Sequence, residues 1–358
     1  MRKRKSSSSR SLFNKHRRNT GTLMPPFANC WYLVCRSADV KTGDVNPKSV
    51  FGREIVIFRG ENGQVGVLDA FCPHLGTHLG YGGVVKDNCI VCPYHSWKFE
   101  TDGRCIDVPY CDSNIEKYSQ IDARKYHVRE TLGMVYVWYH VDWLEPIYEL
   151  DCFEELRGFC VVKEEVTDTW DMHLMEMSQN SADYYHFKTT HHSLPYSNGL
   201  IKIDHDTSCE YRVNDKSHVA VLTQNVSSYS MLGFLAPEFV VEQSRPNATV
   251  TFFGPSILLL KVEYSSYSVI TVMSVTPIED LKQELVTKTF VSSIWFKPLG
   301  FFFHYMSLGT VDQDRRVWEH KSHCKPMRLV NGDGQFVMYS NWLKQFYSEN
   351  SVKIDLSW

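Results

Sequence analysis

The sequence predicts an α+β protein in which a small antiparallel β domain precedes a larger domain of antiparallel sheet with packed helices. Three observations support this fold class. At 358 residues, the chain has room for two domains of ordinary size. Residues 27–140 read as short strands separated by turn signals. Residues 166–346 combine strand patterns with helical ones, as expected where helices pack on a sheet.

Composition narrows the class of protein. A hydrophobic content of 43% and a charged content of 22% are typical of a globular protein. The net charge of −3 argues against a nucleic-acid partner. The 11 cysteines are scattered and odd in number, so we expect reduced thiols in an intracellular, cytosol-facing protein. No run of about eighteen apolar residues predicts a transmembrane helix, and no apolar core follows the basic start as it would in a signal peptide.

The first 24 residues form a basic tail. Arg2–Lys5 is followed by the serine run Ser6–Ser9 and by further basic residues. High charge with little to bury predicts disorder. We expect the tail to be a solvated end of the chain. The alternatives are a nuclear localisation signal and peripheral association with an anionic membrane, such as that of the endoplasmic reticulum.

Residues 25–140 are expected to form the β domain. The strands expected in chain order are Asn29–Cys35, Arg53–Arg59, Val65–Leu68, Cys89–Val91 and Val135–Tyr139. Asn62-Gly63 is a hairpin turn signal between the second and third of them. Thr101–Arg104 indicates another hairpin.

Two Cys/His pairs lie on loops of this domain. Cys72 with His74, and Cys92 with His95, are separated by seventeen residues. A zinc site also uses two cysteines and two histidines, but zinc fingers usually pair Cys with Cys and His with His. Here each pair mixes one of each, which favours a [2Fe–2S] centre with two thiolates on one iron and two imidazoles on the other.

The flanks of the two pairs strengthen this interpretation. Leu75-Gly76 follows the first pair and Ser96-Trp97 follows the second. Over about residues 29–140 the chain resembles the Rieske family, which implies a Rieske [2Fe–2S] cluster. The family usually has glycine directly after the last histidine, where this chain has Ser96. Glycine permits a positive φ or a close approach, and the serine is expected to hydrogen-bond to the cluster, shift its potential or fill space.

Residues 141–358 are expected to form the second domain. Residues 141–160 read as a connection, and a helical pattern runs through Thr169–Tyr185. The expected strands are Tyr211–Val213, Val219–Val226, Ala248–Phe253, Ile257–Tyr264, Ser268–Pro277 and Leu285–Phe290, and the expected late helices are Val311–His323 and Val337–Phe346.

A second group of metal-binding side chains lies in this domain. Asp183 and His186 are three residues apart, so a helix places them on one face. His191 is about 140° further around an ideal helix, so both imidazoles can reach one metal only if the helix ends or distorts between them. Two histidines plus a carboxylate form the facial triad of non-haem Fe(II) oxygenases. The alternative is a pair of surface histidines after a helix.

Together the two groups resemble the Rieske non-haem iron oxygenases, which carry this Asp-x2-His-x4-His arrangement. The resemblance implies mononuclear iron bound by His186, His191 and an aspartate near the start of a late helix. Asp312 and Asp314 are both candidates, and we choose Asp314 because Gln-Asp followed by Trp four residues on resembles the steroid-acting branch. The alternative is that neither aspartate binds metal and that both carboxylates only stabilise the positive N-terminal end of the helix dipole.

The resemblance also assigns roles to neighbouring residues. Asp183 is expected to accept hydrogen bonds from His186 and from a cluster histidine of a neighbouring subunit in a homotrimer. Asn180 is expected close to the iron, and His192 is not expected to be a ligand.

Several short stretches resemble one branch, the eukaryotic cholesterol 7-desaturase group, which is related to bacterial 3-ketosteroid 9-hydroxylases. They include Asn29–Tyr32, Phe58–Gly63 and Asp69–Gly76. This implies a helix-grip catalytic domain and an NAD(P)H- and O2-dependent sterol oxygenase that forms 7-dehydrocholesterol. A reductase or ferredoxin would supply electrons through the cluster to the Fe(II). The alternatives are a steroid hydroxylase and a pure electron-transfer protein.

Overall fold

The computed structural model describes residues 24–111, 114–151, 153–183, 185–199, 201–213, 218–231, 247–264, 266–321 and 328–353. Its strands are β1 (Cys30–Arg36), β2 (Val45–Val50), β3 (Arg53–Arg59), β4 (Val65–Asp69), β5 (Val84–Lys86), β6 (Cys89–Val91), β7 (Lys98–Phe99), β8 (Cys105–Asp107), β9 (Val128–Thr131), β10 (Met134–Tyr139), β11 (Cys160–Val166), β12 (Ile201–Val213), β13 (Val219–Met231), β14 (Asn247–Phe253), β15 (Ile257–Glu263), β16 (Ser268–Glu279) and β17 (Lys282–Val291). Its helices are α1 (Leu174–Ala182), α2 (Tyr185–Thr190), α3 (Lys297–Trp318) and α4 (Gly334–Leu343).

The N-terminal part contains three small antiparallel sheets, ordered β1-β10-β9, β2-β3-β4 and β5-β6-β7-β8. Strand β3 separates two apolar cores. Ile55 and Ile57 point into one core, and Val56 and Phe58 point into the other. Because successive side chains of a strand point to opposite faces, a strand between two cores must be apolar at every position. The loops that carry the Cys/His pairs adjoin the second of these cores, which includes Cys72 and Cys92.

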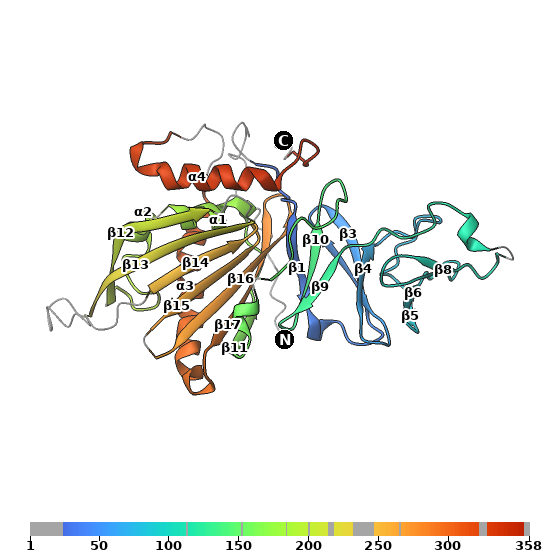
Figure 1. The fold of residues 1–358 in the computed structure, drawn as a ribbon, viewed down its shortest axis with the longest axis horizontal. Coiled ribbons are helices and arrows are strands. Elements are labelled where there is room, and N and C mark those ends of the chain that lie inside the picture. Colours follow the sequence, from blue (N-terminus) through green and yellow to red (C-terminus); the bar gives the residue numbers. More distant parts are fainter. Residues whose placement is uncertain are drawn as a thin grey trace, which may run out of the picture.

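The C-terminal part is built on a single seven-stranded antiparallel sheet, ordered β11-β17-β16-β15-β14-β13-β12. Helix α3 packs against β17, β11 and β16, and α1 packs against α4 and β16. In Figure 1, α3 lies behind the sheet and α4 runs above it. This arrangement confirms the predicted fold class.

One face of α3 is buried. The buried positions that recur every three or four residues are Gly300, His304, Ser307, Val311, Asp314 and Trp318. This is the spacing of one helix face. Gly300 allows α3 to approach the sheet closely, because a Cβ there would lie 2.6 Å from a Val162 side-chain atom and 2.7 Å from one of Val291. His304 Nδ1 lies 2.9 Å from Thr289 Oγ1 on β17.

The two parts share one continuous apolar core. Hydrogen bonds also cross between them. Thr276 Oγ1 donates to the Leu33 carbonyl at 2.6 Å, and the Asn29 amide donates to the Phe346 carbonyl at 2.7 Å. The strand β16 therefore supports the first strand of the N-terminal part as well as α3.

The candidate cluster loops and α2 lie at opposite ends of the molecule. Figure 1 places β5, β6 and β8 at one end of the longest axis, and α2 with β12 at the other. The loop at residues 92–97 directly follows β6.

Three expectations about the second domain need correction. The helical pattern through Thr169–Tyr185 forms the helix α1 only over Leu174–Ala182, because the backbone leaves the helical conformation at Asp183, with φ −91° and ψ 83°, and α2 begins at Tyr185. The late helix begins at Lys297 instead of Val311 and ends at Trp318. Pro298 lies in its first turn, where a missing amide hydrogen has no cost. The sheet also contains β11, which was not expected and which starts at Cys160, the end of the expected connection.

The basic tail lies at residues 1–23, outside the described residues, with Met24 at their edge. Its predicted disorder and membrane contact therefore stay predictions. Across the described ranges, no helix has the length and hydropathy needed to cross a bilayer.

Two glycines of the N-terminal part test its packing. Gly63 and Gly103 both have φ +84°, but a Cβ at Gly103 would lie 2.1 Å from the Ala123 carbonyl oxygen, whereas no described atom lies within 4 Å at Gly63. We expect Gly63→Ala to lower the free energy of unfolding by about 1–2 kcal/mol through its φ alone. Gly103→Ala should cost a further ~1–3 kcal/mol from overpacking. Guanidinium titration of both variants measures the difference, and equal costs would contradict the packing described.

Candidate metal centres

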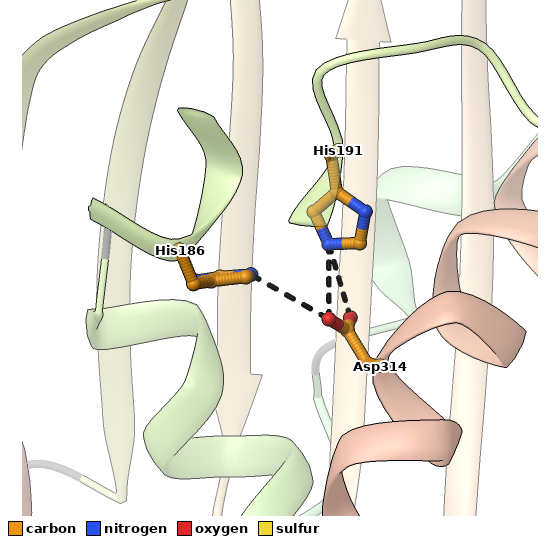
Figure 2. Close-up of side chains that lie close together, drawn as sticks. All are labelled: His186, His191 and Asp314. Atoms are coloured by element: carbon orange, nitrogen blue, oxygen red, sulfur yellow. Dashed lines mark hydrogen bonds and ion pairs between the residues drawn. The ribbon is translucent and has the colours of Figure 1, made fainter. Parts of the chain in front are cut away.

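His186, His191 and Asp314 converge on one point. One potential ligand atom from each of them lies within 4.8 Å of the others. His191 Nε2 lies 3.1 Å from Asp314 Oδ1 and 3.2 Å from Oδ2, and His186 Nε2 lies 3.8 Å from Oδ1. Figure 2 shows the imidazoles arriving from the α2 segment and the carboxylate from α3.

Local backbone breaks bring the two histidines together. Helix α1 ends at Ala182 and α2 begins at Tyr185, so Asp183 and His186 are not on one helix as the sequence suggested. Helix α2 ends at Thr190, and His191 follows directly, with its amide still bonded to the Phe187 carbonyl at 3.1 Å. Its side chain therefore turns toward α3 at the point where the helix stops.

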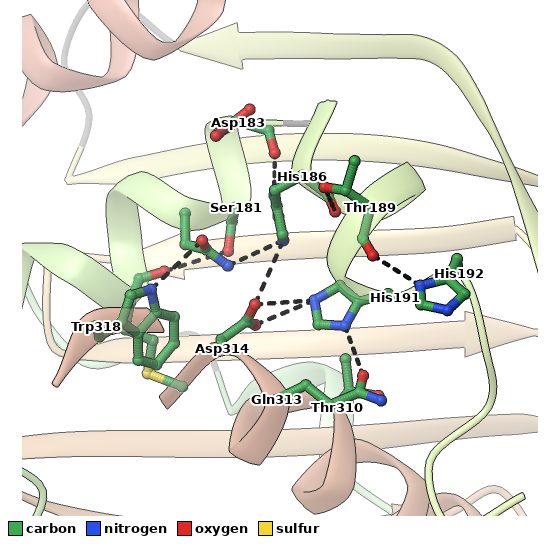
Figure 3. Close-up of polar contacts among 12 residues, drawn as sticks. Ser181, Asp183, His186, Thr189, His191, His192, Thr310, Gln313, Asp314 and Trp318 are labelled. Atoms are coloured by element: carbon green, nitrogen blue, oxygen red, sulfur yellow. Dashed lines mark hydrogen bonds and ion pairs between the residues drawn. The ribbon is translucent and has the colours of Figure 1, made fainter. Parts of the chain in front are cut away.

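Each histidine is oriented through its other ring nitrogen. His186 Nδ1 donates to the backbone carbonyl of Asp183, and His191 Nδ1 donates to Gln313 Oε1 at 2.9 Å. Both acceptors fix the hydrogen on Nδ1 and leave Nε2 as the unprotonated nitrogen on the side of Asp314 (Figure 3). Gln313 is the orienting residue that sequence reasoning missed. Its position next to Asp314 was noted, but nothing in the sequence showed that it reaches His191.

The site favours a bound cation. Asp314 is 6% exposed and His191 3% exposed. Burial lowers the pKa of His186, although the Asp314 carboxylate opposes this effect. The imidazole is therefore neutral at pH 7, the form that binds metals. A buried carboxylate without a cation is costly. In the described part of the chain, the basic side chains within 4 Å of the Asp314 carboxylate are those of His186 and His191, which carry a charge only when protonated.

Asp312, the other candidate for the third ligand, points elsewhere. Its side chain is 48% exposed and lies 3.5 Å from the Arg316 guanidinium. Exposed ion pairs of this kind contribute little to stability. The geometry thus favours Asp314 over Asp312.

The neighbouring residues singled out in the sequence also have defined places. Asn180 Nδ2 lies 3.0 Å from His186 Nε2, and Trp318 Nε1 donates to Asn180 Oδ1 at 3.4 Å. The Asp183 side chain points away from His186, so the contact expected from its carboxylate is made by its backbone carbonyl (Figure 3). His192 is exposed, and its Nδ1 bonds to the Thr189 carbonyl at 2.7 Å.

The two Cys/His loops have the same backbone pattern. The Gly76 amide donates to the Cys72 carbonyl at 2.9 Å, and the Ser96 amide donates to the Cys92 carbonyl at 3.0 Å. Ser96 has φ +61°, close to the +72° of Gly76. The serine thus adopts the left-handed conformation that glycine favours, at a cost of about 1–2 kcal/mol.

The four side chains at these loops fit a cluster with mixed ligands. Cys72 and Cys92 are each 2% exposed, whereas both imidazoles are partly exposed. The rings of His74 and His95 lie 4.8 Å apart between centroids. Burial, with the Cys92 thiol beside it, raises the pKa of the Cys72 thiol to about 12. An iron bound there would have to displace this proton.

Comparison with known families agrees with both centres. Residues 30–127 match the Rieske [2Fe-2S] domain, and residues 137–347 match the 3-ketosteroid 9α-hydroxylase C-terminal domain. The second match covers more than half of the chain. The chain belongs to the Rieske oxygenase family.

Individual relatives give a finer comparison. The chain is 31% identical to a cholesterol 7-desaturase of Drosophila melanogaster, over 92% of this chain and 77% of the relative. It is 24% identical to a probable 3-ketosteroid-9-alpha-monooxygenase oxygenase component of Rhodococcus rhodochrous, over 92% and 82%. Dicamba monooxygenase bound to dicamba shares the fold, with a TM-score of 0.65 at 15% identity over 89% of this chain and 97% of that one.

These matches confirm the resemblance stated from the motifs. A Rieske oxygenase is an oxidoreductase, as predicted. Its N-terminal domain is of the [2Fe–2S] type, and the family uses non-haem iron. The side chains of this Rieske oxygenase fit the cluster and the mononuclear iron, with the paired thiols and imidazoles at the loops and the buried Asp314 carboxylate between two imidazoles.

The two aspartates provide a matched test of the third ligand. In this Rieske oxygenase we expect Asp314→Asn to lower the iron content from about three atoms per chain to about two, because only the mononuclear site is lost. Asp312→Asn should retain about three. Iron analysis of both variants, with visible spectra to check the cluster, measures this. Iron loss in the Asp312 variant alone would assign the ligand to Asp312.

Proposed function

We propose that the protein is an NAD(P)H- and O2-dependent sterol oxygenase, and that its reaction is the 7-desaturation of cholesterol. The observation that carries the proposal is the buried His186, His191 and Asp314 triad in the same chain as a Rieske domain. A reductase or ferredoxin would supply the electrons, Cys72, His74, Cys92 and His95 would hold the cluster that receives them, and the triad would hold the Fe(II) that they serve. Cholesterol 7-desaturases of several animals are 27–31% identical over nearly the whole chain, which supports the substrate.

The protein side chains prepare the site for this chemistry. When bound by His186, His191 and Asp314, the iron would supply the activation of O2 that removes two hydrogens from the sterol to form the double bond. Three protein ligands leave coordination positions open, as this class of reaction requires. Gln313 and the Asp183 carbonyl hold both imidazoles in one orientation. Burial of Asp314 and His191 limits water at the metal.

The two alternatives make different use of the same residues. A steroid hydroxylase keeps both centres, and the relationship to the Rhodococcus 3-ketosteroid monooxygenase component favours it as the second candidate. A pure electron carrier has no use for the triad. The burial and convergence of His191 and Asp314 argue against that role.

A sterol assay separates these functions. Incubation with a reductase, NADPH and cholesterol should give a conjugated 5,7-diene that absorbs in the ultraviolet. His186→Ala should abolish product but keep the visible spectrum of the cluster, because the two centres use different ligands. A hydroxylated steroid without diene would favour the hydroxylase, and an unchanged sterol with full cluster and iron would contradict both oxygenase functions.

We propose further that electrons cross between subunits of a homotrimer. Within one chain the cluster loops and α2 lie at opposite ends of the longest axis (Figure 1), and electron transfer weakens steeply with distance. The Asp183 carboxylate points away from His186 (Figure 3). It is therefore available to accept a hydrogen bond from a cluster histidine of a neighbouring subunit.

Mixed oligomers test this route. Cys72→Ser disables the cluster and His186→Ala disables the mononuclear site, so each variant alone should be inactive. Co-expressed chains with two different tags, purified through both, should regain a measurable part of the activity, because an intact cluster then faces an intact iron site on another chain. A doubly tagged oligomer that holds the cluster on one kind of chain and the mononuclear iron on the other, and is nevertheless inactive, would show that both centres must lie in one chain.

A further inference from the structure

Tyr110 lies against the outer side of the cluster loops and has no place in the reaction described above. It follows β8, on a turn in which the Cys111 amide donates to the Val108 carbonyl at 2.9 Å. Its hydroxyl accepts a hydrogen bond from Trp97 Nε1 at 2.9 Å. The same oxygen lies 3.4 Å from His74 Nε2. One phenol therefore joins the indole behind the cluster to one of the cluster histidines.

The orientation of His74 makes this contact specific. Its ring stacks on Trp97, with centroids 4.6 Å apart and an angle of 7° between the planes. Trp97 itself is buried, with an exposed fraction of 8%. The plane of the imidazole is thus held by a side chain anchored in the core, and its Nε2 edge faces Tyr110.

The contact determines which nitrogen serves the iron. Since Nε2 faces the hydroxyl, Nδ1 is the nitrogen left for the metal, and Nε2 carries the hydrogen. A phenol oxygen can accept two hydrogen bonds. Trp97 donates one of them, and with Nδ1 bound to the iron the Nε2–H of His74 would donate the second.

We propose that Tyr110 is a positioning residue that lowers the reduction potential of the [2Fe–2S] cluster by accepting a hydrogen bond from His74 Nε2–H. An acceptor on the remote nitrogen makes a ligating imidazole a stronger electron donor. Stronger donation stabilises the oxidised iron, and cluster potentials respond to hydrogen bonding around the ligands. The proposal rests on the cluster alone, so it stands or falls independently of the sterol reaction.

The test compares two tyrosines beside the cluster. Tyr110→Phe removes the acceptor and keeps the ring, and we expect the reduction potential of the purified oxygenase to rise. Tyr94→Phe is the matched control, because Tyr94 is 64% exposed and its ring lies 3.8 Å from that of His95. Its hydroxyl makes no hydrogen bond to a cluster ligand among the described residues, so its loss should leave the potential unchanged. A redox titration followed by the visible absorbance of the cluster measures both.

An unchanged potential in Tyr110→Phe, with a full cluster, would overturn the proposal, as would an equal rise in the control. A measurement on the wild-type protein covers the case in which Tyr110→Phe does not assemble its cluster. Pulsed EPR of the reduced cluster with ¹⁵N-labelled histidine should resolve two inequivalent remote nitrogens, and the difference should persist in Asp183→Asn, which removes the carboxylate proposed to contact a cluster histidine from a neighbouring subunit. Equivalent remote nitrogens would also overturn the proposal.

Discussion

The close packing of α3 on the large sheet is the constraint on which the metal site depends. Gly300 leaves no room for a side chain against β11 and β17, and His304 contacts Thr289 at the same interface. Asp314 lies on the same buried face, ten residues after His304 and therefore about 15 Å further along the helix axis. The position of α3 therefore places the Asp314 carboxylate next to His191, the residue that directly follows α2. Any change that tilts α3 moves this ligand relative to the two imidazoles.

The features that sequence could predict are those set by neighbours in the chain. The Cys/His loops, the hairpin at Asn62-Gly63 and strand β3 depend on local spacing, and the structure has them where that spacing places them. Gln313 and Tyr110 were not found, because their partners His191 and His74 lie 122 and 36 residues away. The start of α3 was also missed. Its first turns are rich in aromatic residues that partly face solvent, which hides the helical period.

The two candidate centres share one rule of construction. In each of them a histidine offers one nitrogen to the metal position and gives the hydrogen on the other nitrogen to an oxygen. His186 uses a backbone carbonyl, His191 an amide side chain and His74 a phenol. The three acceptors differ in basicity and in mobility. The electron-donating strength of each imidazole can thus differ, although the ligand type is the same at both sites.

The length of the molecule gives the proposed electron route a physiological meaning. The cluster loops and α2 are kept apart by the large sheet and by the strands β1, β10, β9, β3 and β4 of the N-terminal part (Figure 1). The proposed route puts donor and acceptor on different chains, and under that proposal a lone chain would hold all the residues of the enzyme without being able to turn over. Mass action then links activity to the amount of protein present. The proposed route thus implies that activity falls more steeply than protein concentration once the oligomer dissociates.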